Sequence, residues 1–198
     1  MELLIASTNL HKIREFRQLL APLNWDILSL QDFPDYTAPE ENGKTFEENS
    51  LLKGRHARDH FDMWILSDDS GLVVPSLNGE PGIFSGRYAG ETASDQENRT
   101  KLLHQLKENK INNTSSYFIS CISLIHTEKE EKTFTSTCEG FLLDAERGNN
   151  GFGYDSLFVK NDYKLTFAEL DEKTKLKISP RGKALTKALL FLERHSTA

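Results

Sequence analysis

An apolar segment that runs directly into two adjacent carboxylates is the strongest constraint on this chain. Met63-Trp64-Ile65-Leu66 is typical of a buried strand, and Ser67-Asp68-Asp69-Ser70-Gly71 follows it at once. We expect the strand to end there. Neighbouring side chains on a strand point to opposite faces, so Asp68 and Asp69 are expected to have different roles. Acids beside a glycine at a strand end commonly hold a divalent cation or activate water, although a turn with a helix cap fits the same residues.

Size and charge exclude several classes of function. With 198 residues, the chain forms one or at most two domains, and its net charge of −6 argues against a general nucleic-acid binder. It contains no apolar run of about 18 residues, which predicts no membrane-spanning helix. The N-terminal residues enter a strand pattern without a basic leader, and so do not resemble a signal peptide. Cys121 and Cys138 lie in strand-like runs, which indicates buried thiols in a reducing cytoplasm.

Helices alternate with strands early in the chain, and a long hairpin follows. Helical spacing and capping residues predict helices at 10–20, 45–61 and 94–109, and from Ser179-Pro180 onward. Apolar runs predict strands at 2–6, 25–30, 63–67, 72–74 and 157–159, and a hairpin of 116–126 with 132–143 turning at Glu128–Glu131. We therefore expect an α/β fold, with an elongated mixed sheet flanked by helices and two lobes that leave a cleft between them.

Two segments of the N-terminal half suit an anion and a cation, respectively. The residues from Ser7 to Lys12 join a strand to a helix, where backbone N–H groups and a positive helix end favour an anion; a plain helix cap is the alternative. Glu40 and Glu41 lie on a polar loop and suit a hard cation with oxygen ligands, or are solvated surface acids. Lys53, on the helix that follows, is within reach of a phosphate or is simply exposed.

Two segments of the C-terminal half suit recognition of a base. Gly151-Phe152-Gly153-Tyr154-Asp155 combines tight backbone geometry with two aromatic rings and one acceptor. Rings of this kind stack on heterocycles, and a carboxylate accepts from ring N–H groups; a glycine-rich turn with core aromatics is the alternative. Lys173, Lys175, Lys177 and Arg181 form a basic cluster, in which the planar guanidinium of Arg181 is the best candidate for a fixed contact to phosphate or a purine carbonyl.

Taken in order, six segments resemble the inosine/xanthosine triphosphate pyrophosphatase family, also called the Ham1-like family. The resemblance covers essentially the whole chain, and its specificity comes from the order of the six motifs. They are Ser7-Thr8-Asn9-Leu10-His11-Lys12, the run from Glu40 to Asn49, Ser67-Asp68-Asp69-Ser70-Gly71, the run from Pro81 to Tyr88, Gly151-Phe152-Gly153-Tyr154-Asp155, and Ile178-Ser179-Pro180-Arg181-Gly182.

The resemblance implies a cytoplasmic, Mg²⁺-dependent homodimer that hydrolyses ITP, dITP and XTP to the monophosphate and pyrophosphate. It implies one catalytic domain, 1–198, of two lobes. The implied roles are catalytic acid and metal ligand for Asp69, and metal ligand for Glu40 or Glu41. The implied substrate-binding residues are Ser7, Thr8, Asn9, Leu10, His11, Lys12, Lys53, Ser70, Phe152, Gly153, Tyr154, Asp155, Lys175, Pro180 and Arg181.

One position departs from the family pattern. Family members usually carry a histidine where this chain has Pro180, between Ser179 and Arg181. Proline offers neither a donor side chain nor a backbone N–H, so any base contact made by that histidine is absent here.

Two other functions fit parts of the pattern. A Maf-like pyrophosphatase acting on modified pyrimidines shares the reaction, but the segment from Phe152 to Asp155 favours a purine. A nucleotide-binding module without catalysis is disfavoured by the acids at 40, 41, 68 and 69.

Overall fold

The computed structural model describes residues 1–126 and 130–196, which form two compact units. The first unit comprises 1–69, 120–136 and 181–198, and the second comprises 70–119 and 137–180. The helices are α1 (Leu10–Leu20), α2 (Phe46–Arg58), α3 (Asp95–Glu108), α4 (Glu172–Ile178) and α5 (Pro180–Ser196). The strands are β1 (Glu2–Ile5), β2 (Asp26–Ser29), β3 (Trp64–Val73), β4 (Ser115–Ile125), β5 (Glu131–Leu142) and β6 (Phe158–Lys160). Short 3₁₀ helices lie at Ala21–Leu23, Leu30–Asp32, Pro75–Leu77 and Gly82–Arg87.

The strands form one mixed sheet in the order β2-β1-β3-β4-β5-β6. β1 pairs in parallel with β2 and β3, whereas β5 and β6 are antiparallel. The predicted mixed sheet with flanking helices is therefore confirmed. The predicted hairpin strands β4 and β5 are hydrogen-bonded neighbours, while part of the predicted turn at Glu128–Glu131 lies outside the described residues.

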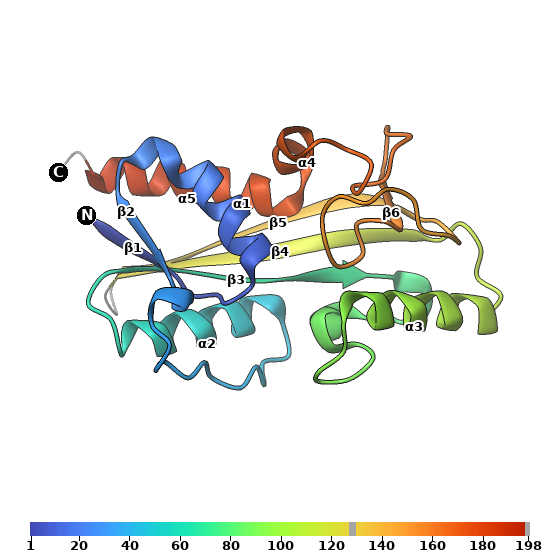
Figure 1. Cartoon of the computed structure of the whole chain (residues 1–198), viewed down its shortest axis with the longest axis horizontal. Helices are drawn as coiled ribbons and strands as arrows, with labels where there is room; N and C mark the ends of the chain where they lie inside the picture. The colour runs from blue at the N-terminus through green and yellow to red at the C-terminus, as the bar shows by residue number, and fades with distance from the viewer. Residues whose placement is uncertain (127–129, 197–198) are drawn as a thin grey trace. The chain divides into compact units, whose positions relative to one another are not determined.

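The first unit buries both faces of β1 and β3. Leu3, Ile5 and Leu66 pack with the apolar faces of α1 and α5, and the intervening Leu4 and Ile65 pack with residues of α2. Figure 1 shows α1 and α5 on one side of these strands and α2 on the other. Alternate residues of a strand point to opposite faces, so an unbroken apolar run is what a strand covered on both sides requires.

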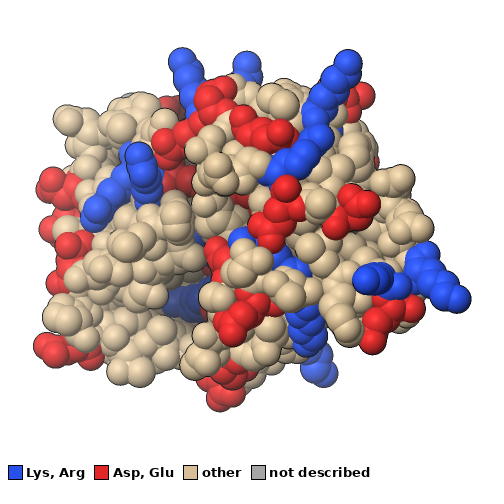
Figure 2. Space-filling view, turned by 45° about the vertical axis from the view of Figure 1, so that its right-hand side comes forward, with Lys and Arg blue, Asp and Glu red and all other residues tan. Residues whose placement is uncertain are grey.

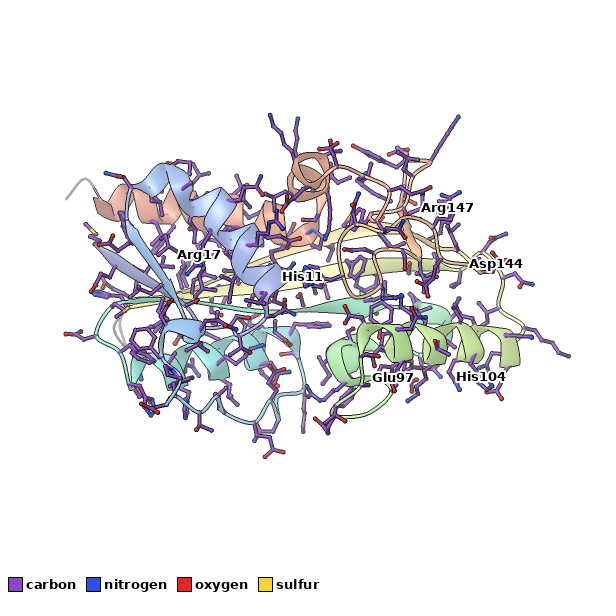
Figure 3. All side chains as sticks on the ribbon, in the orientation of Figure 1. His11, Arg17, Glu97, His104, Asp144 and Arg147 are labelled. Carbon is purple, nitrogen blue, oxygen red and sulfur yellow. The ribbon has the colours of Figure 1, made fainter. Side chains whose placement is uncertain are left out.

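The second unit has its own core around α3 and the β5–β6 pair. Leu72, Leu102, Leu142, Phe158 and Phe167 are each at most 1% exposed and belong to one cluster. α3 begins with a capping box, in which Ser94 and Glu97 satisfy each other's backbone N–H groups. Figure 3 labels Glu97 on this helix. The corresponding box of α2 is only half formed: Thr45 caps α2 by accepting the Glu48 N–H, but the Glu48 carboxylate accepts the Lys44 N–H instead.

One sequence-based expectation about the elements is wrong, and one helix was not predicted. β3 does not end at residue 67 but continues through both aspartates to Val73, because each carboxylate finds partners on its own face of the sheet. Residues 172–178, interpreted as a basic cluster, form the helix α4. Asp171 caps that helix by accepting the Thr174 N–H, and Ser179 closes it directly before Pro180 opens α5.

Charges of both signs cover the surface. On the face shown in Figure 2, lysine and arginine side chains are interspersed with aspartate and glutamate. Among the described residues, no helix is both long and apolar enough to cross a membrane.

We predict that Gly140→Ala destabilises the protein, whereas Gly86→Ala is nearly neutral. A Cβ at Gly140 would overlap the Val159 carbonyl oxygen and the Phe158 ring, but a Cβ at Gly86 meets nothing within 4 Å. Overpacking of this kind costs about 1–3 kcal/mol. Urea unfolding of both variants measures the difference, and equal stabilities would contradict the packing of β5 on β6.

Candidate active site

Asp68 lies at the centre of a buried ion-pair network in the first unit. Its Oδ2 atom is 2.7 Å from Lys12 Nζ and 3.4 Å from Arg181 Nη2, and its Oδ1 accepts a 2.6 Å hydrogen bond from Ser120. Burial raises the pKa of this carboxyl, but the charges of Lys12 and Arg181 outweigh burial and hold the pKa far below its usual range. Asp68 is therefore a permanently charged anchor.

Asp69 points to the opposite side, toward α2. Its Oδ1 atom is 3.1 Å from Lys53 Nζ, and its Oδ2 accepts a 3.3 Å hydrogen bond from the Asn49 amide. Burial raises the pKa of Asp69, and the charges of Lys53 and Lys12 only partly offset that rise. The Lys53 pKa is also raised, because Asp69 and Glu41 outweigh its own burial. The predicted division of roles between the two aspartates thus has a physical basis, with one anchored and one poised to accept a proton.

Of the two predicted metal-binding glutamates, only Glu41 contacts a partner of Asp69. Glu41 Oε1 is 2.9 Å from Lys53 Nζ, so one ammonium group bridges Glu41 and Asp69. Glu40, by contrast, is exposed. Over the described part of the chain, no three His, Cys, Asp or Glu side chains are gathered as a metal site. The pair of carboxylates around a single cationic group nevertheless offers the oxygen ligands that suit Mg²⁺.

Arg181 is held by carboxylates of the first unit. Its guanidinium bonds Glu15 and Asp68, and its Cζ atom lies 5.9 Å from the centre of the Phe16 ring. These ion pairs join four carboxylates to three cations, an excess of one carboxylate among the residues named: Glu15, Glu41, Asp68 and Asp69 with Lys12, Lys53 and Arg181. The contact of Arg181 with a purine stays a prediction.

The turn between β1 and α1 forms a helix cap, and its role as an anion site stays a prediction. Asn9 caps α1 by accepting the Lys12 N–H, and Ser7 Oγ accepts the Asn9 N–H at 3.2 Å. Thr8, Leu10 and His11 are exposed, and Figure 3 labels His11 on the first turn of α1. The helix start therefore presents its N-terminal end at the surface, beside the ammonium of Lys12.

In the second unit, a hydrogen bond and an ion pair fix the carboxylate of Asp155 in the glycine-rich segment. Asp155 Oδ2 accepts the Phe152 N–H at 2.9 Å and lies 2.7 Å from Lys175 Nζ, while that ammonium is 4.7 Å from the Phe152 ring centre. Gly151 has φ +77°, and a Cβ there would overlap the Asp155 carboxylate. The glycine is therefore required both by its backbone conformation and by the close approach of the acid.

The residues around Asp155 are also fixed. The Tyr154 hydroxyl donates to the Ser85 carbonyl at 2.9 Å, and the Gly153 N–H donates to Asp95 at 2.7 Å. Lys175, one of the implied substrate-binding residues, thus lies with the predicted base-binding residues of its own unit. Ser70 is half-buried on β3, and Pro180 is the buried first residue of α5.

Sequence reasoning missed three buried polar residues of the first unit. Glu15 and Ser120 complete the Asp68–Arg181 network, and Asn49 contacts Asp69. Asn49 gave a signal, since it ends the motif from Glu40 to Asn49 and lies one turn before Lys53 on the predicted helix. Glu15 gave a weaker one, as an acid on the same helix as the buried Ile13 and Phe16.

We predict a large loss of stability for Asp68→Asn and only a small change for the neighbouring substitution Asp69→Asn at neutral pH. A group whose pKa falls on folding stabilises the folded state while ionised, and a group whose pKa rises does the reverse. Removing the Asp68 charge leaves buried cations undercompensated and costs about 3–5 kcal/mol. Asp69→Asn changes the free energy of unfolding by about 1 kcal/mol or less. Urea unfolding measures both, and a larger loss for Asp69→Asn would contradict the assignment.

Comparison with known proteins gives a consistent picture. The family model of the Ham1 family matches residues 3–191. A dITP/XTP pyrophosphatase of Protochlamydia amoebophila is 52% identical over 196 residues, which cover 98% of each chain. The dITP/XTP pyrophosphatase of Chlamydia caviae is 46% identical over 195 residues, covering 98% of this chain and 95% of that protein.

Solved structures agree. A HAM1 protein from Coxiella burnetii superposes with a TM-score of 0.89 at 37% identity, covering 98% of this chain and 99% of that one. The Staphylococcus aureus Ham1 protein gives a TM-score of 0.86 at 38% identity, covering 98% of this chain and all of that one. The chain therefore belongs to the Ham1 family.

Proposed function

We propose that this chain, over residues 1–198, is a nucleoside triphosphate pyrophosphatase that hydrolyses dITP, ITP and XTP to the monophosphate and pyrophosphate. Its similarity to proteins named dITP/XTP pyrophosphatase supports the reaction and the substrates. The observation that carries the chemistry is the contrast between two adjacent buried carboxylates, because the pKa of Asp68 is lowered and that of Asp69 is raised. Only Asp69 is thereby suited to take a proton from water.

In this proposal, the first unit binds the phosphates. The N–H groups at the start of α1 and the ammonium of Lys12 attract the triphosphate, and Lys53 adds a second cationic donor. Asp69 orients the attacking water and accepts its proton. Asp68 takes no part in proton transfer but keeps Lys12 in place through their 2.7 Å ion pair.

Glu41 and Asp69 are the residues that would hold Mg²⁺. Their carboxylate oxygens suit this ion, and the excess of one carboxylate among the paired residues leaves room for added positive charge. When bound, the ion neutralises charge that develops on the leaving pyrophosphate. Glu40, being exposed, is not assigned to the metal.

The second unit is proposed to recognise the base. Hypoxanthine and xanthine present a ring N1–H, for which the Asp155 carboxylate is the acceptor, and Phe152 supplies an aromatic surface for stacking. Lys175 and the Phe152 N–H orient that carboxylate. Adenine presents an acceptor at N1, so it leaves the carboxylate mispaired, which is worth about 10- to 100-fold in discrimination.

The resemblance to the family also supports two broader proposals. We propose that the protein acts in the cytoplasm and that it does so as a homodimer. Both rest on family membership and not on a contact in the structure.

Pyrophosphate release from a panel of nucleotides tests the function. We expect Mg²⁺-dependent turnover of ITP, dITP and XTP, with dATP lower by about 10- to 100-fold. Asp69→Asn should lower ITP turnover by about 10²- to 10⁴-fold, because the proton acceptor is lost. Preference for dTTP or UTP would instead indicate a pyrimidine enzyme, and wild-type turnover by Asp69→Asn would refute the role of that residue.

Glu41→Gln and Glu40→Gln form a matched pair for the metal assignment. Both changes remove one charge from the same loop, but only Glu41 contacts Lys53. We expect Glu41→Gln to raise the Mg²⁺ concentration needed for half-maximal ITP turnover by about tenfold or more, and Glu40→Gln to leave it unchanged. A reversed order would move the metal ligand to Glu40.

A further inference from the structure

Asn49 is the one side chain of α2, besides Lys53, that is seen to contact both the acidic loop and Asp69. It lies in the first turn of the helix and is fully buried. Its Oδ1 atom accepts the Gly43 N–H at 2.8 Å, and its Nδ2 atom donates to Asp69 Oδ2 at 3.3 Å. Gly43 lies two residues after Glu41, so one amide joins the loop of the proposed metal ligand to the proposed catalytic acid.

The orientation of this amide follows from its partners. A backbone N–H can only donate, so the atom facing Gly43 must be the oxygen of Asn49, and the NH₂ group must face Asp69. A carboxylate beside that NH₂ group is a suitable acceptor. The two contacts therefore use the two ends of the amide in the only arrangement that satisfies both.

The loop approaches Asn49 too closely for any side chain at position 43. A Cβ on Gly43 would lie 2.5 Å from Asn49 Oδ1 and 2.9 Å from Glu48 Cβ. This approach places the Gly43 N–H against the amide. The loop and the helix therefore pack closely at this point, as they must if Asn49 is to hold the loop in place.

Asn49 and Lys53 act from the same face of α2, one turn apart. Lys53 bonds Asp69 Oδ1 and Glu41, whereas Asn49 bonds Asp69 Oδ2 and the Gly43 N–H. Both oxygens of Asp69 are held in this way. Lys53 holds Asp69 through its positive charge, which another cation can supply. The Asn49 amide is uncharged and is kept in place by its burial.

We propose that Asn49 is a positioning residue, whose amide sets the orientation of the Asp69 carboxylate and ties the Glu41 loop to it. This role rests on the proposed function of Asp69. Asn49 is assigned no contact with the substrate and acts through Asp69 and the loop. Misalignment of a catalytic group by a fraction of an ångström to 1 Å costs about 10- to 100-fold in rate, so its loss is expected in kcat more than in KM.

Two substitutions separate the two contacts. Asn49→Ala removes both, while Asn49→Asp keeps an acceptor for the Gly43 N–H but replaces the donor to Asp69 by a like charge. Ser50→Ala is the matched control, because Ser50 is equally buried on α2 and its hydroxyl bonds Ser123 Oγ at 2.9 Å and the Ser67 carbonyl at 3.3 Å, but neither Asp69 nor the loop. The substitution keeps the backbone carbonyl of residue 50, which accepts the 2.7 Å hydrogen bond from Ser67 Oγ. A merely structural role would make Asn49→Ala and Ser50→Ala behave alike.

The test combines ITP kinetics with amide hydrogen exchange of Gly43 measured by NMR on the full chain. We expect kcat to fall about 10- to 100-fold in both Asn49 variants, with KM within about threefold, and to stay near wild type in Ser50→Ala. Gly43 exchange should accelerate in Asn49→Ala but remain slow in Asn49→Asp and Ser50→Ala.

Unchanged Gly43 exchange in Asn49→Ala, or unchanged kcat in Asn49→Asp, would overturn the proposal. Should Asn49→Ala fail to fold, Asn49→Asp, which preserves side-chain volume, decides it through kcat. If the wild-type protein releases no pyrophosphate from ITP, the proposed function of the site fails, and Gly43 exchange still decides whether Asn49 anchors the loop.

Discussion

The alternation of side chains along β3 is the constraint on which the site depends. Because the strand continues through Asp68 and Asp69, the two carboxylates must leave the sheet on opposite faces. One face supplies Lys12 from α1 and Arg181 from α5, and the other supplies Lys53 from α2. Burial raises the pKa of both carboxyls, but at Asp68 the charges of Lys12 and Arg181 outweigh burial and lower the pKa, whereas the pKa of Asp69 stays raised. A turn at this point, as the sequence suggested, would have lost that separation.

The register between α2 and β3 determines which side chains of α2 reach Asp69. Ser50 Oγ donates to the Ser67 carbonyl, and Ser67 Oγ donates to the Ser50 carbonyl at 2.7 Å. These reciprocal bonds join helix and strand directly before the aspartates. Asn49 and Lys53 flank Ser50 on the helix, so their reach to Asp69 follows from this register. The shorter of the two bonds runs from Ser67 Oγ to the Ser50 backbone carbonyl and does not need the Ser50 hydroxyl.

Local patterns predicted the elements well, and long-range partners poorly. The helix at 10–20 and the capping box of Ser94 were predictable because spacing and capping are local. The continuation of β3 was not, since it depends on partners such as Ser120, fifty-two residues away. α4 was not predicted, because residues 173–177 were interpreted by their charge as part of a basic cluster. Asp171 is nevertheless an ordinary N-cap residue for this helix. The pairing of Arg181 with Glu15 spans 166 residues and has no local signal.

The choice between Glu40 and Glu41 shows the same limit on a smaller scale. Adjacent loop residues have equal chemistry, and only the fold reveals which one faces Lys53. Charge then explains why this choice matters. Among the residues named, carboxylates outnumber cations by one. A triphosphate therefore adds negative charge to a site whose positive charges are already paired. In the proposed function an added cation offsets this charge, and Glu41 and Asp69 are the residues proposed to hold it.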